Sequence, residues 1–509
     1  TNSSYNGQIA VLKANGTVTF ESCKFVIAAT NYASDGNKNQ IFTLNTGNSG
    51  LLNLKDSTII VSESSNLNTI ANTAMFTTWN NAAAQVTFDS TTINLSTFKN
   101  LALFKAGNGV VKTTLKIQNK SNIKVAKSIN NPTIAIENST LENTADGANL
   151  FEYSNRSEAI SVSAKNATLT AKKYAFNITG CKAAVNVSLD GTTVIDGAKR
   201  AFSVTKNTKA VNITASGNTE IRSAAGEGNA IYVCGQPKKT GNDLIDGDFS
   251  AEIFTLTLKD NAKLISSGDV ISFANSNNWI NKATITAVGN VTITAGSDKY
   301  LIATCSELAD GAITYIESDN TKLEAKAWTT SELKATKISV PAPKMQKGAS
   351  VRLVEGSSGL RFSSTLANLA EGATVKQVRY GTLIAIHSEL GTNDFTIAAL
   401  EAAGIEFANI VATEEGTVAG DGFNTYNAAL TNIPDDYCSV DFAARAYAVY
   451  EINGVEYYVY TDYNEDTNVR NFYEICESAL ADTLSSSDPN YTKAGYPYQI
   501  WGEDLWSPY

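Results

Sequence analysis

The chain has 509 residues, and its 40 basic and 50 acidic side chains give a formal net charge of −10. This charge argues against a nucleic-acid backbone or an anionic membrane surface as the main partner. No apolar run approaches the ~18 residues that a membrane-spanning helix needs. The composition suits an extracellular or cell-surface protein, and we predict no nucleic-acid partner and no membrane span.

A short pattern recurs through the first two thirds of the chain. Each copy has an apolar-x-apolar strand, a polar turn of Asp, Asn, Ser or Gly, and a second short strand, as in "VTFDSTTINLS" (86–96). A third apolar segment, such as "AFNITG" (175–180), follows most copies. Self-similarity at a period of about 20–50 residues indicates a solenoid. The copies begin at residues 18, 52, 86, 115, 134, 160, 185, 211, 256 and 283, with a degraded last copy at 312–325.

Three strands of period two in each copy, without a helical stretch between them, predict a parallel β-helix of about eleven coils over residues 1–337. The alternation places Val, Ile, Leu and Phe inside and Thr, Asn, Lys and Ser outside. Only Pro132 and Pro237 fall in the first 340 residues, as expected where backbone N–H groups pair in ladders. The longest step between copies, from 211 to 256, predicts a projecting loop at 234–252.

In this pattern, residues 5–330 resemble the right-handed β-helix of the pectin-lyase-like superfamily, although none of its catalytic motifs is present. The resemblance is architectural. It implies a fold and says little about activity.

A different domain follows the repeat. The stretch "ISVPAPKMQKGAS" (338–350) interrupts the pattern, so we predict a linker at 338–348 and a β-rich α+β or β-sandwich-like domain at 349–485. Asn453-Gly454 supplies the two residues with positive φ that a tight hairpin turn needs. The other predicted elements are two strands in 349–366, a strand at 377–386, a helix at 396–404 stopped by Gly404 and a helix within 468–484.

Several motifs of this domain, among them "GASVRL", "YGTLIA", "DFAARAYAVY" and "NVRNFYEI", have a characteristic spacing. In that spacing, residues 348–485 resemble an uncharacterised module of exported proteins from anaerobic gut Firmicutes. The resemblance implies a bacterial, exported protein and carries no assigned chemistry.

The chain offers few groups for catalysis. Polysaccharide hydrolases on such scaffolds need grouped carboxylates, whereas the repeat region has no Asp-Asp pair and no histidine. The single histidine, His387, ends an apolar strand, which indicates a structural role. No GxSxG, P-loop or GxGxxG fingerprint is present. The sequence therefore predicts no catalytic residue, and a polysaccharide lyase or hydrolase is a lesser alternative.

Metal ligands are equally sparse. The six cysteines are scattered, without a CxxC pair or a Cys/His cluster, so zinc is not predicted. Asp462, Asn464 and Asp466 alternate as calcium ligands do, but Thr467 stands where an EF-hand has glycine. A turn into a helix capped by Asp466 or Thr467 explains the same residues more simply. We predict no cofactor, with calcium as a weak alternative.

The last segment, 486–509, is rich in aromatic residues. We predict an extended tail, because Pro497 and Pro508 prevent a regular helix and the rings keep neither a strand nor a helix period. The rings either fold back on their own domain, dock on a neighbouring copy or contact a ligand. The candidates for docking between subunits are Tyr496, Tyr498, Trp501, Trp506 and Tyr509.

These features favour a non-catalytic structural protein of a bacterial surface that assembles with other copies of itself into a filament, sheath or surface layer. A solenoid needs caps, and no amphipathic capping helix precedes "YNGQIAVLKANGTVTF" (5–20). The alternative is an adhesin or glycan-binding surface protein that uses loops such as 234–252. A phage tail fibre is a weaker option.

Overall fold

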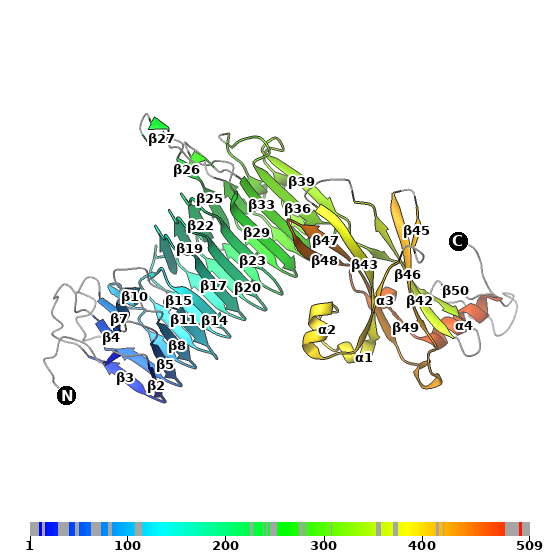
Figure 1. The fold of residues 1–509 in the computed structure, drawn as a ribbon, viewed down its shortest axis with the longest axis horizontal. Coiled ribbons are helices and arrows are strands. Elements are labelled where there is room, and N and C mark those ends of the chain that lie inside the picture. Colours follow the sequence, from blue (N-terminus) through cyan, green and yellow to red (C-terminus); the bar gives the residue numbers. More distant parts are fainter. Residues whose placement is uncertain are drawn as a thin grey trace. The chain divides into compact units, whose positions relative to one another are not determined.

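The computed structural model describes residues 10–12, 16–28, 40–45, 50–62, 73–79, 84–106, 114–223, 228–237, 239–240, 243–244, 252–273, 278–279, 282–306, 308–352, 358–369, 375–413, 417–420, 422–483 and 498–500. The chain forms two compact units. Thr1–Ile316 and Thr321–Ile338 make the first, and Glu317–Asn320 and Ser339–Tyr509 make the second. Both are built mainly of β-strands (Figure 1).

The first unit is a parallel β-solenoid, as predicted. Its coils stack so that equivalent strands form long sheets in chain order (Figure 1). The largest has twelve strands among the described residues: β2 (Thr17–Glu21), β5 (Leu51–Lys55), β8 (Gln85–Asp89), β11 (Thr114–Gln118), β14 (Thr133–Glu137), β17 (Ile160–Lys165), β20 (Val185–Asp190), β23 (Val211–Ala215), β29 (Glu252–Asp260), β33 (Lys282–Gly289), β36 (Ile313–Ser318) and β39 (Ala335–Val340).

A second sheet runs beside it, with eleven strands in the described part of the chain. In order these are β3 (Lys24–Ile27), β6 (Thr58–Val61), β9 (Thr92–Asn94), β12 (Asn122–Val125), β15 (Thr140–Asn143), β18 (Thr168–Ala171), β21 (Val194–Gly197), β24 (Glu220–Ser223), β30 (Lys263–Ser266), β34 (Thr292–Thr294) and β37 (Lys322–Glu324).

The third strand of each coil belongs to one of two shorter sheets. The first contains β1 (Ala10–Leu12), β4 (Gln40–Asn45), β7 (Thr73–Trp79) and β10 (Leu101–Ala106). The second contains β13 (Ile129–Asn130), β16 (Phe151–Ser154), β19 (Tyr174–Thr179), β22 (Arg200–Thr205), β25 (Ile231–Cys234), β31 (Ile271–Phe273), β35 (Tyr300–Ala303) and β38 (Ala327–Thr329). The sequence pattern had not identified β10 or β13.

The stretch predicted as a projecting loop carries short strands of its own. β26 (Gln236–Pro237) pairs with β32 (Asn278–Trp279), and β27 (Lys239–Thr240) pairs with β28 (Asp243–Leu244). Figure 1 shows β26 and β27 standing apart from the stacked coils.

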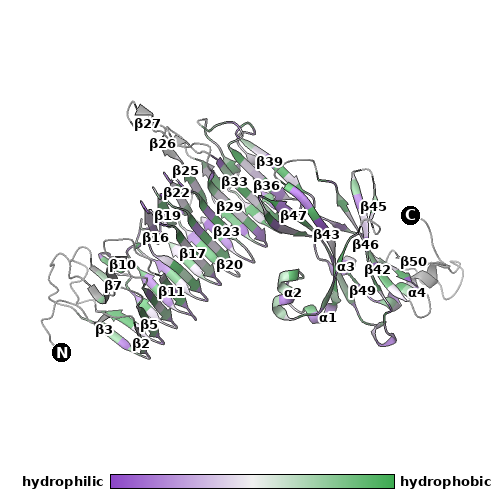
Figure 2. Ribbon diagram, in the orientation of Figure 1, coloured by the Kyte–Doolittle hydropathy of each residue, from purple (hydrophilic) through white to green (hydrophobic). Residues whose placement is uncertain are grey.

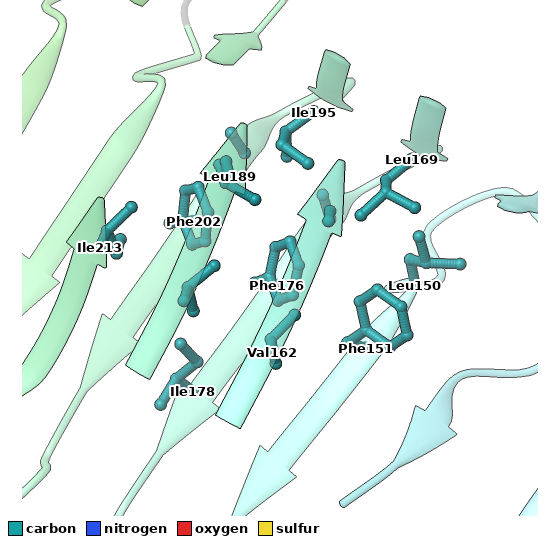
Figure 3. Packing of buried hydrophobic residues seen from close by; sticks show 14 of the residues in the cluster. Leu150, Phe151, Val162, Leu169, Phe176, Ile178, Leu189, Ile195, Phe202 and Ile213 are labelled. Atoms are coloured by element: carbon teal, nitrogen blue, oxygen red, sulfur yellow. The ribbon is translucent and has the colours of Figure 1, made fainter. Parts of the chain in front are cut away.

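Alternation along each strand builds the solenoid core. Buried and exposed residues alternate along all of β17 and along the first five residues of β20. Figure 2 shows hydrophobic and hydrophilic residues alternating along the strands of the solenoid. Neighbouring coils pair in register, so like side chains stack: Phe176 pairs with Phe151 and with Phe202. Their ring centroids lie 5.0 and 4.8 Å apart (Figure 3). The core is therefore a continuous column of stacked apolar side chains.

The polar turn between the first two strands of a coil has a repeated chemistry. A residue with positive φ, such as Ser90 or Asn138, is followed by a buried Ser or Thr. The Thr91 hydroxyl donates 2.8 Å to the Leu54 carbonyl of the preceding coil. The next coil repeats this with Ser121, whose hydroxyl donates to a carbonyl and accepts from the Thr91 N–H. These hydroxyls satisfy backbone groups that the turn leaves unpaired.

The second unit has two antiparallel-rich sheets. One contains β45 (Thr417–Ala419), β46 (Phe423–Thr431), β42 (Gly359–Ala367), β41 (Ala349–Arg352) and β50 (Tyr498–Ile500), with β40 (Lys344–Met345) on β42. The other contains β44 (Phe407–Val411), β43 (Val375–Ile386), β47 (Phe442–Ile452) and β48 (Val455–Tyr460), with β49 (Val469–Arg470) on β47. The two sheets share a core that includes Phe362 and Ala444.

Helices complete this unit: α1 (His387–Leu390), α2 (Ile397–Ala403), α3 (Glu465–Asn468), α4 (Phe472–Thr483) and the 3-10 turn η2 (Asp435–Tyr437). α4 adds Phe472 and Ile475 to the core between the sheets. Leu400 of α2 packs instead with Leu383 and Val449 of the sheet that contains β43 and β47. This sheet is therefore buried on both faces.

Local turn chemistry was predicted correctly in this unit. Asn453 and Gly454 have φ of 52° and 78° and join β47 to β48. Gly404 ends α2 in the left-handed conformation. The helix expected within 468–484 begins only at Phe472, because Val469–Arg470 pair with β47 as β49. The stretch predicted as a linker, 338–348, includes the end of β39 and all of β40.

Candidate functional site

The first described coil of the solenoid leaves its outer edge unpaired. β1, β2 and β3 each occupy the end of their sheet in the part of the chain that the structure describes. Phe20 and Phe25 point towards the core, with ring centroids 5.2 Å apart, but both are only partly buried. One coil further on, the equivalent Leu54 and Ile59 are fully buried. Apolar interior and backbone hydrogen-bonding groups are thus accessible at one end of the described coils.

Exposed apolar side chains lie on the outside of the same coils. Val26 of β3 is 60% exposed, and its register partner Ile60 of β6 is 39% exposed. In the next coil this position is Asn94, as the outward alternation requires. The first two described coils therefore carry two neighbouring exposed apolar side chains at a position that is polar in the following coil, and we call Val26 and Ile60 the outer apolar strip.

The aromatic tail is described only in part. Its segment Tyr498–Ile500 forms β50, which pairs in parallel with Ala349–Val351 of β41. A short strand therefore exists where the sequence suggested neither a strand nor a helix. Tyr496, Trp501, Trp506 and Tyr509 lie outside the described residues. Their role in docking stays a prediction.

Carboxylates of the solenoid are engaged with neighbouring coils. Both oxygens of Glu152 accept hydrogen bonds, from Asn149 and Asn177 at 2.7 Å each. Burial would raise the pKa of Asp89, but hydrogen bonds from Asn119, Gln118 and Ser90 outweigh it and lower the pKa below its ordinary value. A lowered pKa keeps the Asp89 carboxylate ionised as an acceptor, which does not suit a general acid.

The candidate calcium ligands have structural partners. The Asn464 side chain accepts 2.8 Å from the Asp466 N–H and caps α3, so the N-cap is Asn464 and not Asp466 or Thr467. Arg470 donates to the Asp466 carbonyl. Across the described residues, no group of three or more His, Cys, Asp or Glu side chains is placed to hold a metal ion. Calcium binding at Asp462, Asn464 and Asp466 stays a weak prediction.

His387 begins α1 directly after β43, at the strand end that the sequence indicated. Its Nε2 lies 3.4 Å from Glu465 Oε1, and the Glu465 side chain is 72% exposed. An exposed carboxylate of this kind is a weak surface partner rather than a buried group that orients an imidazole.

A cluster of cations and aromatic rings spans three successive coils of the solenoid, where the second strand of a coil leads into the third strand (β19, β22 and β25). We call Lys172, Lys173, Tyr174, Lys199, Arg200 and Tyr232 the basic corner. The Arg200 guanidinium carbon lies 3.8 Å from the Tyr232 ring centroid and 5.3 Å from that of Tyr174. Lys173 Nζ lies 4.8 Å from the Tyr174 centroid. Cations over ring faces at these distances are attracted by the ring quadrupole.

The backbone fixes the position of this corner. The Lys173 carbonyl accepts from the N–H groups of both Lys199 and Arg200, at 2.9 and 3.2 Å. The preceding Gly197 must lack a side chain, because a Cβ there would lie 1.7 Å from the Arg200 carbonyl oxygen. Burial is the largest influence on the Tyr232 hydroxyl and raises its pKa. Its ring therefore remains neutral beneath the guanidinium at ordinary pH.

Sequence reasoning missed the basic corner, although a signal was present. "KKYAF" (172–176) and "AKRAF" (198–202) lie 26 residues apart, and Tyr174 pairs with Arg200 across neighbouring coils. Aligning the copies would have stacked these residues.

A search of protein-family models found no match, and neither the curated proteins nor the solved structures yielded one. None of the described helices has the length and apolarity to cross a membrane.

Proposed function

We propose that this chain is a non-catalytic structural protein of a bacterial extracellular surface, and that it assembles with copies of itself through the first described coil of its solenoid. One observation carries the proposal: β1, β2 and β3 each form the edge of a sheet, and the partly buried rings of Phe20 and Phe25 lie at the same end of the described coils. A strand added there would gain backbone hydrogen bonds and cover apolar surface together.

Other observations support parts of this proposal. Glu152 and Asp89 serve as hydrogen-bond acceptors between coils, which suits a structural role. The stacked strand order supports placing the solenoid with the pectin-lyase-like β-helices, and the motifs of residues 348–485 support an exported bacterial module. Extracellular location, assembly and these two resemblances remain proposals.

Assembly is tested by sedimentation velocity and negative-stain electron microscopy over a range of concentrations. We expect concentration-dependent oligomers from the natural chain. Val26→Lys adds a charge to the outer apolar strip, and Phe20→Asp adds one at the accessible interior, so both should leave monomers. Thr168→Lys, on an exposed position of β18 in mid-solenoid, is the matched control and should still assemble. Monomers of the natural chain at every concentration would refute the proposal.

Removing residues 486–509 tests the aromatic tail separately. The deletion takes away β50, an edge strand of the second unit. If the tail docks on a neighbouring copy, the truncated chain should stay folded and stop assembling. If it assembles normally, the first coil alone accounts for association. Unfolding of the second unit would instead place the tail in its own core.

A glycan-binding surface protein is the second candidate, favoured by the aromatic rings and cations of the basic corner. Both functions are compatible with one scaffold, because the first coil and the basic corner are separate parts of the solenoid.

A further inference from the structure

The basic corner stands out against the charge of the whole chain. The protein carries a net charge of −10, yet Lys172, Lys173, Lys199 and Arg200 gather on two successive coils. Among the described residues, no carboxylate forms an ion pair with any of the four. Repulsion among four cations is unfavourable, so an anion bound there would relieve it.

Two carboxylates on or beside the strands of this sheet accept hydrogen bonds from other groups. Glu152, one coil before Asn177, accepts from two amide side chains. Asp269 accepts 2.9 Å from the Tyr300 N–H. In the part of the chain that the structure describes, neither forms an ion pair with Arg200.

Arg200 is held in a geometry that leaves its hydrogen-bonding edge available. The guanidinium carbon lies over the Tyr232 ring, 3.8 Å from its centroid, which is too close for an N–H group to point between them. Stacking uses the face of the guanidinium and leaves the N–H groups at its rim, which match two oxygens of a carboxylate or sulfate. The side chain is also pre-ordered, which lowers the entropy that binding would cost.

The two tyrosine rings add a second kind of contact. Tyr174 and Tyr232 flank Arg200 on the outward side of β19 and β25, and both side chains keep part of their surface exposed. A ring face next to a cation suits a sugar, whose C–H groups pack on the ring while its acidic substituent meets the cation. For an anionic polymer without sugars, the rings would serve only to hold Arg200 in place.

We propose that the basic corner binds an acidic glycan, with Arg200 as the carboxylate or sulfate anchor, Tyr174 and Tyr232 as sugar platforms, and the three lysines as supporting cations. The site goes beyond the assembly proposed above and does not depend on it. It deepens the second candidate function by assigning the ligand class and the residues.

Binding of the full chain is measured by biolayer interferometry to chondroitin sulfate, unsulfated chondroitin, neutral dextran and poly-glutamate. We expect binding to at least one of the two acidic glycans, weakening as salt rises, and none to dextran. Equal binding of the two chondroitins would assign the carboxylate as the recognised group, and binding of the sulfated form alone would assign the sulfate. Both outcomes support the site.

Three variants locate the binding. Arg200→Gln should weaken it about tenfold, since charge-assisted hydrogen bonds are lost. Arg200→Lys keeps the charge without the planar fork and should weaken it about threefold. Tyr232→Leu should also weaken it about threefold. Lys263→Gln, at an exposed position of β30 on another sheet, is the control and should change binding less than twofold.

Several results would overturn the proposal: no binding to either acidic glycan, poly-glutamate binding as tightly as the glycans, or Arg200→Gln matching Lys263→Gln. Thermal melting checks that each variant is folded. If Arg200→Gln does not fold, Arg200→Lys and Tyr232→Leu decide the question. Val26→Lys, which addresses assembly alone, should leave glycan binding unchanged, so the two proposals fail independently.

Discussion

The two units of this chain satisfy their buried polar groups in opposite ways. In the solenoid, Thr91 and Ser121 repeat one hydrogen-bonding scheme in successive coils: each hydroxyl lies within hydrogen-bond distance of a carbonyl in the preceding coil and of a carbonyl in its own turn. In the second unit, buried Arg445 makes hydrogen bonds that belong to no repeat. It donates to the carbonyls of Thr461 and Phe395, which are 16 and 50 residues away. The solenoid therefore distributes its stability over local interfaces, whereas the second unit depends on single long-range contacts.

The largest test of this contrast is a cavity in the solenoid. Phe176→Ala removes a fully buried ring stacked between Phe151 and Phe202, at an expected cost of about 3–5 kcal/mol. Hydrogen exchange by mass spectrometry should show faster exchange in β16, β19 and β22 and little change in β47. The exposed Ser163→Ala is the control. Equal loss of protection along the whole solenoid would contradict the local character of its stability.

A smaller loss, spread more widely, is expected in the second unit. Arg445→Leu removes both hydrogen bonds to buried carbonyls and should cost about 2–4 kcal/mol. Because these bonds tie β47 to distant segments, exchange should rise across β43, β47 and α2 together. Arg379→Ala, which breaks a more exposed ion pair with Glu456, should cost less than about 1 kcal/mol. A loss confined to residues beside Arg445 would remove the contrast with the solenoid.

The turn hydroxyls test the repeated scheme itself. Thr91→Val keeps the shape and leaves the Leu54 carbonyl without its 2.8 Å donor, at an expected cost of about 1–2 kcal/mol. The neighbouring Thr92 is exposed, so Thr92→Val should change the unfolding free energy by less than about 0.5 kcal/mol. Urea unfolding of both variants gives the difference. Equal changes in the unfolding free energy of the two variants would mean that the buried Thr91 hydroxyl stabilises the fold no more than the exposed Thr92 hydroxyl does.

The two units also differ in how much of their fold could be predicted from the sequence. The solenoid was predictable because each coil restates its pattern, so that β19 and β22 were found from "AFNITG" and "AFSVT". β13 escaped because its two residues, Ile129–Asn130, are too few to show a period. In the second unit only local signals worked, such as Asn453-Gly454. The pairing of β50 with β41 joins segments about 150 residues apart, and no local pattern encodes it.

The basic corner shows a further limit of the sequence. Tyr174 and Arg200 could be stacked by aligning the similar segments "KKYAF" and "AKRAF" of neighbouring coils. The contact between Arg200 and Tyr232 could not, because the strand pairing places Ser203 and not Arg200 opposite Tyr232. The guanidinium reaches this ring diagonally, and side-chain direction rather than register decides the contact.

The smallest expected effect is a pH dependence that belongs to the solenoid turns. Hydrogen bonds that outweigh burial lower the pKa of Asp89 in the folded chain. Its contribution to stability is therefore complete above the unfolded pKa, about 4, and is lost as pH falls through the folded pKa. In the natural chain, Gln118 and Asn119 donate to different carboxylate oxygens of Asp89. Asp89→Asn leaves one acceptor oxygen for these two donors.

Thermal melting of the natural chain and of Asp89→Asn should therefore differ near pH 7 and converge as pH falls below about 4. Asp56→Asn, at an exposed turn one coil earlier, is the control. Asp56 has a positive φ, which Asn tolerates. A difference between the natural chain and Asp89→Asn that stays constant with pH would show that the amide disturbs packing rather than charge. A difference that vanishes in acid would show that ionisation of Asp89 controls a polar contact between coils. Buried Arg445 donates to two carbonyls, which do not ionise, so its hydrogen bonds should have no such pH dependence at ordinary pH.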